Sequence, residues 1–565
     1  MPILRTVITD PAELERRSTP RDDLMVREFE VAPGVLAADD GPFSRWDRRF
    51  TTTDGVTVET IDYQLAVPHW GWLVGLLLRR PVRTGLAPDQ KPAWCPSDRL
   101  GRREANILGL CATLAVVAGF LGGLIGQTIT YIAADLGGTT ATQANSLTVI
   151  RIGAVLTFAA TALADQRGRR PLLRACLVIA GLACLVTAIA PDFATVTGSQ
   201  LVARGLVAGA AYLIPIICAE ELPAGSRAYA IGLMALPGGL GVGIVLWFVP
   251  FLDAADWAWR LLFVLALPAL IVAILTARRL PETARFEHDD HVPAEHAHQH
   301  MRPSRLVVLA AGMFFLNIFT APTQQLQTDY LRNTRGLSST AVAIFILATN
   351  TWGFIGIFAG AKLADRSSRR RAATIGLLGL AIGNTAMFCI GGPPMWVASL
   401  VGSMVGAAVV PSLGALLPEL FPTLRRGAAN GLLNGAAVIG SMTGLYIVGQ
   451  VVTDGIYGPT VAALALGPLI VAGLVWRLPE TAGVELEALS DLGASAPVTL
   501  LTWMRSRSVS SCWRVLRRRT MGLGGAGGFG GGGREGSGSP ALRGLAALGL
   551  SGLASLQVQR LPSVF

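Results

Sequence analysis

One pattern occurs twice in this chain: residues 161–173 read TALADQRGRRPLL and residues 361–374 read AKLADRSSRRRAAT. Aligning Asp165 with Asp365 matches the Leu-Ala-Asp triplet and the paired arginines that follow it, at an offset of 200 positions. Each copy is a short basic segment between two long apolar blocks. The repeat therefore predicts that a structural unit is duplicated within the chain.

A second pair of segments supports the same duplication. The sequence RLPETARFE occupies residues 279–287, and RLPETAGVE occupies residues 477–485. Their prolines, Pro281 and Pro479, lie 198 positions apart. Because two independent markers recur at nearly one offset, the chain is predicted to consist of two related halves, as in many transporters.

The composition indicates a membrane protein. Of 565 residues, 52% are apolar and only 15% are charged, with a mean hydropathy of +0.51; a soluble chain carries about 25% charged residues. One apolar block of about 20 residues is also found as a buried helix in a large soluble protein, but a long series of such blocks indicates helices that cross a membrane. The blocks lie near residues 105–127, 143–163, 172–190, 198–219, 229–250, 259–277, 304–321, 339–361, 373–391, 395–416, 428–450 and 459–476.

The arginines predict the orientation in the membrane. One side carries Arg167, Arg169, Arg170, Arg174, Arg227, Arg278, Arg279, Arg366, Arg369, Arg370, Arg371, Arg425 and Arg426. The other side has Arg260, Arg332 and Arg335, together with Asp135, Asp192, Asp253, Asp256 and Asp454. By the positive-inside rule the first side is cytoplasmic, and an even number of spans places both termini there. We therefore expect a multi-pass protein of the plasma membrane, and we attribute the net charge of +10 to topology rather than to nucleic-acid binding.

The repeated motifs resemble those of the major facilitator superfamily, over roughly residues 100–485. The family signature between its second and third helices reads Gly-x-Leu-Ala-Asp-Arg-x-Gly-Arg-Arg. The first copy matches it at Leu163, Ala164, Asp165, Gly168, Arg169 and Arg170, and departs from it at Thr161 and Gln166. The second copy has Ala361 and Ser368 at the glycine positions. The Pro-Glu-Thr motifs and the segment PELFPTLRRGAANG are most similar to the branch of sugar and organic-acid porters.

The resemblance implies an all-α membrane protein with twelve transmembrane helices in two pseudo-symmetric six-helix bundles. On this basis the chain divides into a cytoplasmic N-terminal extension (1–103), an N-terminal bundle (104–285), a His-rich cytoplasmic loop (286–303), a C-terminal bundle (304–485) and a Gly-rich tail (486–565). The tail is predicted to be disordered, since Gly and Ser cannot form a packed core.

Charged residues near the cytoplasmic helix ends are candidates for a gate. Asp165 follows a helix end beside several arginines, so it can tie the loop to neighbouring helix termini by charge-assisted hydrogen bonds. Alternatively, these charges only enforce topology. The resemblance implies that the network holds the two halves together in the outward-facing state and breaks when the inward side opens. Its predicted members are Asp165, Arg169, Arg170, Glu220, Glu221, Arg227, Glu282, Asp365, Arg366, Arg369, Arg370 and Glu480.

Arg151 is the most unusual residue inside a span. An arginine near the centre of a transmembrane helix costs roughly 2.5–3.5 kcal/mol on insertion scales, so it should face a cavity or a partner. No acidic residue is found at matching depth, and a guanidinium can bind a carboxylate or phosphate through two parallel bonds. The alternative is that Arg151 pairs with helix carbonyls or reaches outward to the interface. The residue 200 positions later is Thr351.

The predicted substrate site combines polar groups from both halves. Each of these residues alone is also compatible with helix packing. The candidates are Arg151, Gln127, Tyr212, Asn317, Gln324, Asn350 and Thr351. Arg204 matches an arginine common in the porter branch and is predicted to be structural.

These features predict a secondary active transporter of a small organic solute, most simply an anionic organic acid. A sugar or drug transporter is an alternative, although the segment Leu236–Gly241 departs from the Gly-Pro-x-x-Gly-Gly signature of drug antiporters. A transport-fold sensor and a channel are alternatives of another class. No histidine and no nucleophilic triad lies within a span, so an enzyme, a cofactor and a metal site are not expected. The expected partners are the substrate, a coupling proton and the lipid bilayer, with no nucleic acid, and the chain is expected to act as a monomer. Because no carboxylate lies in the central third of a span, proton coupling stays open.

Two segments outside the spans are open to two interpretations each. Residues 65–80, LAVPHWGWLVGLLLRR, are too short to cross a membrane and suit either an interfacial helix or the core of a small cytoplasmic domain. Residues 287–300, EHDDHVPAEHAHQH, hold five of the six histidines. Their spacing fits no standard metal site, so a solvated linker is favoured over a metal-binding loop.

Overall fold

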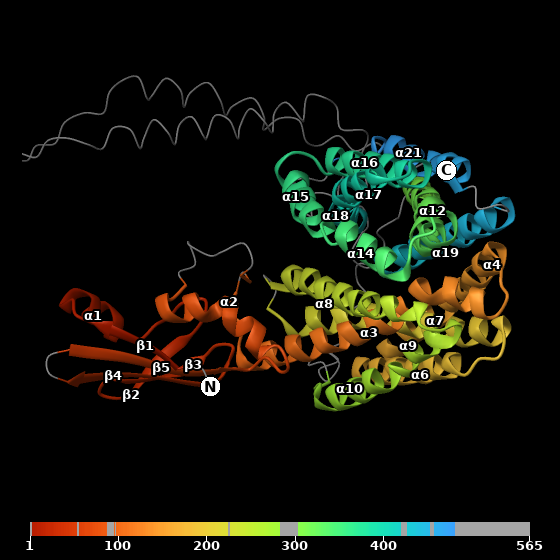
Figure 1. The fold of residues 1–565 in the computed structure, drawn as a ribbon. Helices are drawn as coiled ribbons and strands as arrows, with labels where there is room; N and C mark the ends of the chain where they lie inside the picture. The colour runs from red at the N-terminus through yellow and green to blue at the C-terminus, as the bar shows by residue number, and fades with distance from the viewer. Residues whose placement is uncertain are drawn as a thin grey trace, which may run out of the picture. The chain divides into compact units, whose positions relative to one another are not determined.

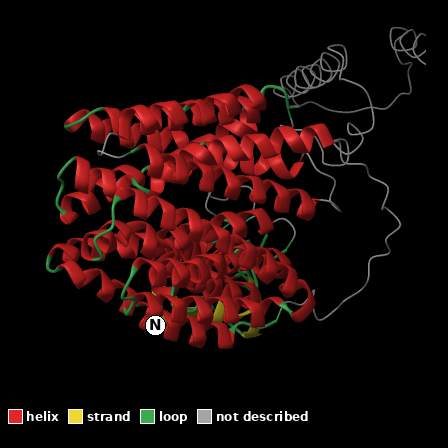
Figure 2. Cartoon of the chain, turned by 90° about the vertical axis from the view of Figure 1, so that its right-hand side faces the viewer, coloured by secondary structure: helices red, strands yellow, loops and turns green. Residues whose placement is uncertain are grey.

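The computed structural model describes residues 3–53, 56–86, 95–96, 98–223, 226–282, 303–419, 426–452, 457–478 and 480. The histidines of the predicted loop and all of the predicted Gly-rich tail lie outside these residues. Figure 1 shows the order of the elements along the chain, and Figure 2 shows that helices dominate it, with the strands confined to one small region.

The N-terminal residues form a small domain, here called the sheet domain, that precedes the first transmembrane helix. Its five antiparallel strands lie in the order β1-β5-β4-β3-β2. They are accompanied by two helices, and the elements are β1 (Ile3–Ile8), α1 (Pro11–Ser18), β2 (Arg27–Ala32), β3 (Val35–Asp40), β4 (Phe43–Thr53), β5 (Val56–Leu65) and α2 (Gly71–Thr84). Trp46 and Ile61 of the sheet pack with Leu78 and Val82 of α2. The apolar stretch at 65–80 therefore contributes to the core of a small domain, which was one of its two predicted alternatives.

The sheet itself was not predicted, and its buried charges explain why. Arg48 is fully buried and donates to Glu59 (Nε to Oε1, 2.6 Å) and to Glu28 (Nη1 to Oε2, 2.9 Å). These three side chains occupy inward positions of their strands, where the sequence shows charges instead of apolar residues. The strands therefore lack the alternation of apolar and polar residues by which a strand is recognised in a sequence.

The remaining described residues form the transmembrane part, which contains twelve helices long and apolar enough to cross a membrane. They separate into an N-terminal bundle of α3–α10 and a C-terminal bundle of α12–α21 (Figure 1). The N-terminal bundle consists of α3 (Arg102–Asp135), α4 (Thr140–Ile150) with α5 (Ala154–Arg167), α6 (Arg169–Ala188), α7 (Phe193–Glu221), α8 (Arg227–Phe248), and α9 (Trp259–Val264) with α10 (Ala266–Arg279). The C-terminal bundle consists of α12 (Pro303–Gln325), α14 (Ser339–Asn350) with α15 (Gly353–Arg366), α16 (Arg369–Cys389), α17 (Pro393–Gly406) with α18 (Val409–Glu419), α19 (Arg426–Val451), and α20 (Tyr457–Leu464) with α21 (Leu466–Val475).

Helix breaks recur at the 200-residue offset of the sequence repeat. The last span of each bundle is interrupted at Leu265 and at Ala465. Pro268 and Pro468 follow these positions, and a proline cannot donate a hydrogen bond to the carbonyl four residues earlier, which loosens the helix there. The two-bundle, pseudo-symmetric architecture predicted from the repeat is thus confirmed.

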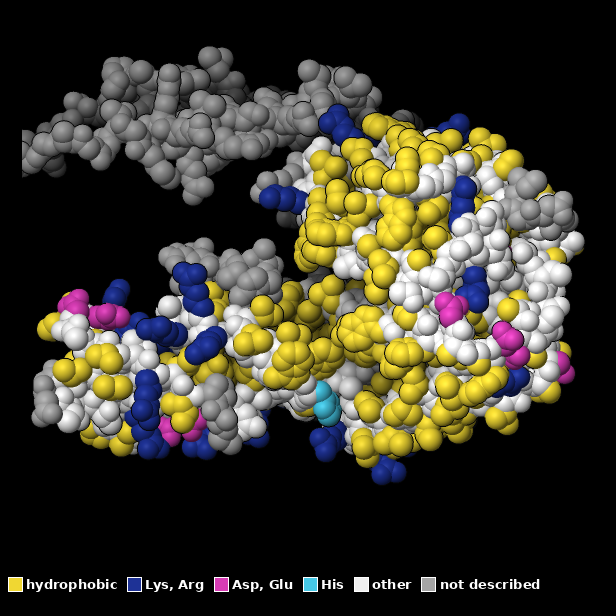
Figure 3. All heavy atoms as spheres, viewed as in Figure 1, with side chains coloured by type: hydrophobic (Ala, Val, Ile, Leu, Met, Phe, Trp, Pro, Cys, Tyr) yellow, Lys and Arg dark blue, Asp and Glu magenta, His cyan; other side chains and the backbone are white. Residues whose placement is uncertain are grey.

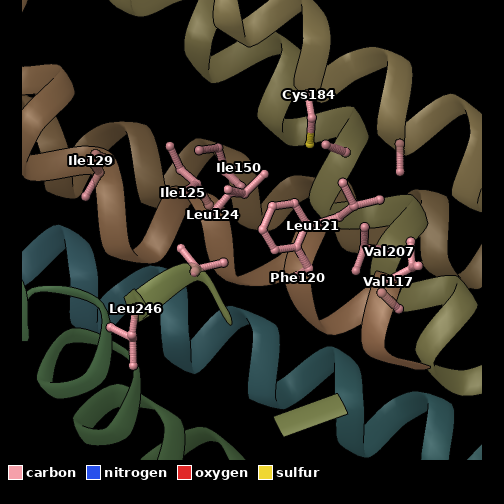
Figure 4. Packing of buried hydrophobic residues seen from close by; sticks show 14 of the residues in the cluster. Val117, Phe120, Leu121, Leu124, Ile125, Ile129, Ile150, Cys184, Val207 and Leu246 are labelled. Carbon is pink, nitrogen blue, oxygen red and sulfur yellow. The ribbon is translucent and has the colours of Figure 1, made fainter. Parts of the chain in front are cut away.

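The second span of each bundle is broken at a corresponding place. A 3₁₀ turn, η2 (Arg151–Gly153), separates α4 from α5, and residues 351–352 separate α14 from α15. The turn lies next to the close-packed core of the N-terminal bundle, where Phe120, Leu121 and Leu124 of α3 pack among side chains of the surrounding helices (Figure 4). Both predicted substrate residues at this depth, Arg151 and Thr351, therefore lie at helix breaks rather than within continuous helices.

Candidate substrate site and gates

The turn that carries Arg151 is fixed by close contact with α7. A methyl group in place of either Gly153 or Gly205 would collide with backbone atoms of the other helix, including the Leu201 and Gly153 carbonyl oxygens. The Thr157 hydroxyl donates to the Gly205 carbonyl oxygen at 2.7 Å. Because small residues allow the two backbones to touch, the turn has little freedom to move relative to α7.

Arg151 is half-buried, and its charge has no counter-ion among the described residues. Its side chain makes no hydrogen bond or ion pair to any of them. The charged group that acts on it is another cation, Arg204 of α7. Arg204 donates to the Gly122 carbonyl oxygen of α3, in agreement with its predicted structural role. Two guanidinium groups thus lie within electrostatic range of each other in the middle of the membrane part, and no carboxylate of the described residues pairs with Arg151.

The other predicted substrate residues fall into two groups. Tyr212 of α7 is 47% exposed, and Gln324, Asn350 and Thr351 are also exposed. Asn317 instead donates to the Met313 carbonyl oxygen of its own helix at 2.9 Å. Gln127 accepts a hydrogen bond from Thr328 at 3.4 Å and so takes part in a contact between the two bundles.

One face of the membrane part is closed by contacts between the bundles. We call it the opposite face, because it lies across the membrane from the basic connections 167–170 and 367–371, which define the arginine-rich face. Asp253, at the end of η4 (Val249–Asp253) after α8, accepts from Arg332 (Nη1, 2.6 Å) and from the Ser339 amide (2.8 Å) at the start of α14. Tyr131 of α3 donates to the Ser339 hydroxyl oxygen at 2.7 Å.

A second inter-bundle cluster surrounds Asp329, which is 1% exposed and lies after α12 on α13 (Gln327–Asp329). From the N-terminal bundle it accepts hydrogen bonds from Gln143 (2.8 Å) and Thr140 (3.1 Å). From the C-terminal bundle it accepts from Asn333 at 2.7 Å and from the Tyr457 hydroxyl. The carboxylate thus joins helices of both bundles on the opposite face.

No sequence pattern pointed to a role for Asp329, and Asp253 and Arg332 were expected only to indicate topology. The available signal was an acidic residue directly after the seventh span, in the segment LQTDYL at residues 326–331. Its partners Gln143, Thr140 and Tyr457 are distant in sequence, so only the fold identifies it as a gate candidate.

On the arginine-rich face, the ion pairs seen among the described residues join helices of the same bundle. The carboxylate of Glu282 accepts from the backbone amides of Arg169 (3.1 Å) and Arg170 (3.2 Å) at the start of α6. Glu480 accepts in the same way from the Arg369 amide (3.0 Å) at the start of α16. Each Pro-Glu-Thr glutamate therefore satisfies amides at the N-terminus of a neighbouring helix, where a negative charge is favourable.

Further pairs extend this network within each bundle. Arg169 bonds Glu220 at 2.7 Å, and Arg103 bonds Glu221 at 3.1 Å. Arg370 bonds Glu480 at 3.3 Å. The side chains of the other predicted gate residues, Asp165, Arg227, Asp365 and Arg366, lie outside what the structure describes. Several of the predicted gate residues thus pair within their own bundle, in a conformation whose opposite face is closed between the bundles. Their role as a gate between the bundles stays a prediction.

No group of three or more His, Cys, Asp or Glu side chains that could hold a metal occurs in the described part of the chain. The His-rich segment 287–300 lies outside that part. The two bundles thus meet at the opposite face of the membrane part and carry charged clusters at the arginine-rich face.

Comparison with known proteins agrees with this architecture. The family model of the Major Facilitator Superfamily matches residues 111–360 and 306–558. A Haemophilus influenzae protein named for metabolite transport is 26% identical over 324 residues, which cover 49% of this chain and 72% of that protein. A monosaccharide-sensing protein of Arabidopsis thaliana is 30% identical over 193 residues, but the match spans only 26% of its length.

Solved structures show the same fold. The xylose transporter from E. coli in an inward-open conformation aligns with a TM-score of 0.58 and 17% identity, over 69% of this chain and 99% of the transporter. A nucleoside transporter aligns with a TM-score of 0.56 and 13% identity, over 66% of this chain and 99% of that one. With its duplicated motifs, twelve candidate spans and matching family model, the chain belongs to the Major Facilitator Superfamily and is a multi-pass membrane transporter rather than an enzyme.

Proposed function

We propose that this transporter moves a small organic anion across the plasma membrane by alternating access, and that Arg151 binds the anion. The observation that carries the proposal is the unpaired charge of Arg151 beside Arg204, halfway along the second span. A buried or half-buried charge without a partner is unfavourable unless a ligand neutralises it. The planar guanidinium presents parallel donors that suit a carboxylate or a phosphate.

The helix breaks support the position of this site. In transporters with repeated halves, substrates bind near the middle of the membrane, where discontinuous helices expose polar groups. Arg151 lies at such a break in the N-terminal bundle, and Thr351 lies at the corresponding break in the C-terminal bundle. The exposed Asn350, Thr351 and Tyr212 are the groups that we assign to the uncharged part of the substrate.

Alternating access follows from the two sets of contacts. The clusters around Asp253 and Asp329 hold the opposite face closed, so the proposed site opens toward the arginine-rich face, which we predict to be cytoplasmic. To expose the site on the opposite face, these inter-bundle bonds must break. We assign the compensating contacts on the arginine-rich face to the predicted gate network that includes Asp165, Glu220 and Arg369.

A neutral sugar is the second candidate substrate. It is favoured by the similarity in fold to xylose transporters, one of which is described as a proton:xylose symporter, and by the monosaccharide-sensing relative. A sugar would need hydrogen-bonding groups but no unpaired arginine. The two candidates therefore make different demands on Arg151, and proton coupling is compatible with both.

The test measures uptake into proteoliposomes that contain wild-type, Arg151→Ala or Arg151→Lys protein. Radiolabelled carboxylates and phosphorylated metabolites are compared with sugars. We expect wild-type protein to take up an anion saturably, Arg151→Ala to lose more than about 90% of that uptake, and Arg151→Lys to recover little, because loss of a charge-assisted bidentate contact costs roughly 2–3 kcal/mol.

Arg174→Ala is the matched control, because Arg174 is an exposed arginine of α6 and should leave uptake unchanged. A well-folded Arg151→Ala protein that transports the anion with unchanged affinity and rate would overturn the assignment. Saturable uptake of a sugar alone, insensitive to Arg151, would favour the second candidate.

A further inference from the structure

The surface where the sheet domain meets the first transmembrane helix is not explained by transport. Helix α2 presents exposed apolar side chains there, with Trp72 70%, Leu76 66% and Leu77 62% exposed. At 100° per residue, these side chains occupy the side of α2 that faces away from Leu78 and Val82, which pack on the sheet. A continuous apolar face of this kind on one helix marks an interaction site.

The same side of α2 also carries arginines, toward the C-terminal end of the helix beyond Trp72 and Leu76. Arg79, Arg80 and Arg83 are exposed, and so is Arg102 at the start of α3. Their side chains make no hydrogen bond or ion pair within the described ranges. In contrast, Arg17 and Arg48 of the same domain pair with Glu59. Figure 3 shows arginine side chains gathered over the sheet domain, whereas hydrophobic side chains cover much of the bundles.

The start of α2 is attached to α3 at the depth where the membrane surface is expected. Trp70 donates its indole N–H to the Thr113 hydroxyl at 3.0 Å, and Pro68 packs against Gly109. The apolar block of α3 begins near residue 105, so Gly109 and Thr113 lie within about its first two turns, at the arginine-rich end of the span. The apolar, N-terminal half of α2 thus begins at the membrane interface, where tryptophan is commonly found. The arginines lie in the C-terminal half of the same helix.

A cavity of ≈ 1340 Å³ lies at this junction. Its lining includes Tyr63, Trp72, Leu76, Arg79, Arg102 and Asn106. Pockets for small ligands usually measure about 300–1,000 Å³, so this space is large enough for a ligand bigger than a typical metabolite. A lining that mixes apolar side chains with unpaired arginines suits a molecule with an acyl part and a phosphate.

We propose that this surface binds anionic phospholipid of the leaflet on the arginine-rich face, with the apolar half of α2 in the interface and its arginines on the phosphates. We name the surface formed by Trp72, Leu76, Leu77, Arg79, Arg83 and Arg102 the lipid face. Clusters of arginine next to a membrane attract anionic lipids by about 1 kcal/mol per residue, and apolar side chains add hydrophobic binding. Lipid binding at this surface does not depend on the identity of the transported solute.

The test measures hydrogen exchange of the full-length protein in nanodiscs. One set contains only phosphatidylcholine, and a second contains about one third phosphatidylglycerol. We expect the amides of residues 71–84 to exchange roughly fivefold more slowly or better with the anionic lipid, because one kcal/mol of binding changes an opening equilibrium about fivefold. Glycerol 3-phosphate added to the neutral nanodiscs should have no such effect.

Matched variants separate the lipid face from general charge and hydrophobicity. Arg79→Glu with Arg83→Glu should abolish the slowing, whereas Arg5→Glu with Arg16→Glu, which alters the net charge equally at exposed positions of the same domain, should retain it. Leu76→Ser with Leu77→Ser should weaken it, whereas Phe29→Ser with Val31→Ser, at exposed positions of β2, should not.

Three outcomes would overturn the proposal. Equal exchange of residues 71–84 in the two kinds of nanodisc would show that the surface does not recognise anionic lipid. Equal slowing by glycerol 3-phosphate would identify a site for a soluble anion instead. Equal loss of slowing in the Arg5→Glu, Arg16→Glu variant would reduce the effect to overall charge.

Discussion

Gly205 holds the contact between α7 and the turn that carries Arg151. A Cβ atom at this position would collide with the Gly153 carbonyl oxygen, which is backbone and cannot rotate away. We predict that Gly205→Ala lowers the free energy of unfolding by about 1–3 kcal/mol, as overpacking of a close contact does. The thermal unfolding midpoint of the purified protein in detergent measures this change.

Gly198→Ala is the control for this prediction. Gly198 lies on the same helix, and a Cβ atom there meets nothing within 4 Å. Substituting it should leave the midpoint unchanged or raise it slightly, because alanine favours a helix over glycine. Equal midpoints for Gly205→Ala and the wild-type protein would show that the turn near Arg151 adapts easily and does not hold that side chain in place.

The sequence identified Arg151 as a residue of interest but not its local structure. An arginine within an apolar block is visible in any sequence, since its cost in a membrane follows from its charge alone. The 3₁₀ turn that displays it depends on Gly153 meeting Gly205, which lies more than 50 positions away, and on the Thr157 bond to the same glycine. Likewise, nothing in the sequence indicated that Asn317 would be engaged with its own helix while Tyr212 stayed exposed.

At the scale of elements, Glu282 and Glu480 perform equivalent tasks for two helices. Each carboxylate accepts from backbone amides at the start of a neighbouring helix, α6 and α16 respectively. We predict that Glu282→Ala and Glu480→Ala each destabilise the protein by about 1 kcal/mol, the usual cost of a lost N-terminal cap. Thermal unfolding of the single and double variants tests this, with the exposed Glu15 of α1 replaced by alanine as the control.

The double variant adds a second test. Because the two capped helices belong to different bundles, the effects of Glu282→Ala and Glu480→Ala should add. A clearly non-additive result would contradict the separation of the two clusters seen here. A wild-type midpoint in both single variants would show that other groups satisfy these amides.

Most transmembrane elements could be predicted from the sequence, because length and hydrophobicity alone define a span. The sequence also contains a signal for the breaks at Leu265 and Ala465, since Pro268 and Pro468 lie just after them. The sheet domain could not be predicted in the same way. Its strands carry Arg48 and Glu59 at buried positions, so the pairing of these charges across the sheet takes the place of apolar residues.

At the scale of the whole molecule, the sequence predicted two bundles but not the contacts that close them. Asp329 bonds Gln143 and Tyr457, which lie on either side of it by more than 100 positions. Such a cluster depends on how the two bundles meet, so no local sequence pattern predicts it. The gate that we propose for the arginine-rich face could be proposed from the sequence, because most of its residues belong to repeated motifs.

The two gates should respond in opposite directions to loss of charge. Asp253→Asn weakens the bonds to Arg332 and to the Ser339 amide, so it should open the opposite face. A loss of about 1–2 kcal/mol would raise the population open on that face about 5–30-fold. Asp165→Asn should weaken the gate that we propose for the arginine-rich face and so reduce that population.

Labelling of a buried cysteine measures both changes. Ala144 of α4 is fully buried and faces Gly449 of α19, so a cysteine there reacts only when the bundles separate on the opposite face. In intact cells, with exposed Cys389 changed to serine, an impermeant maleimide should label Ala144→Cys faster with Asp253→Asn and more slowly with Asp165→Asn. A cysteine at exposed Ala194 should label equally in all backgrounds. Equal rates at Ala144→Cys would mean that neither carboxylate biases the conformational equilibrium, and the proposed gates would then be structural only.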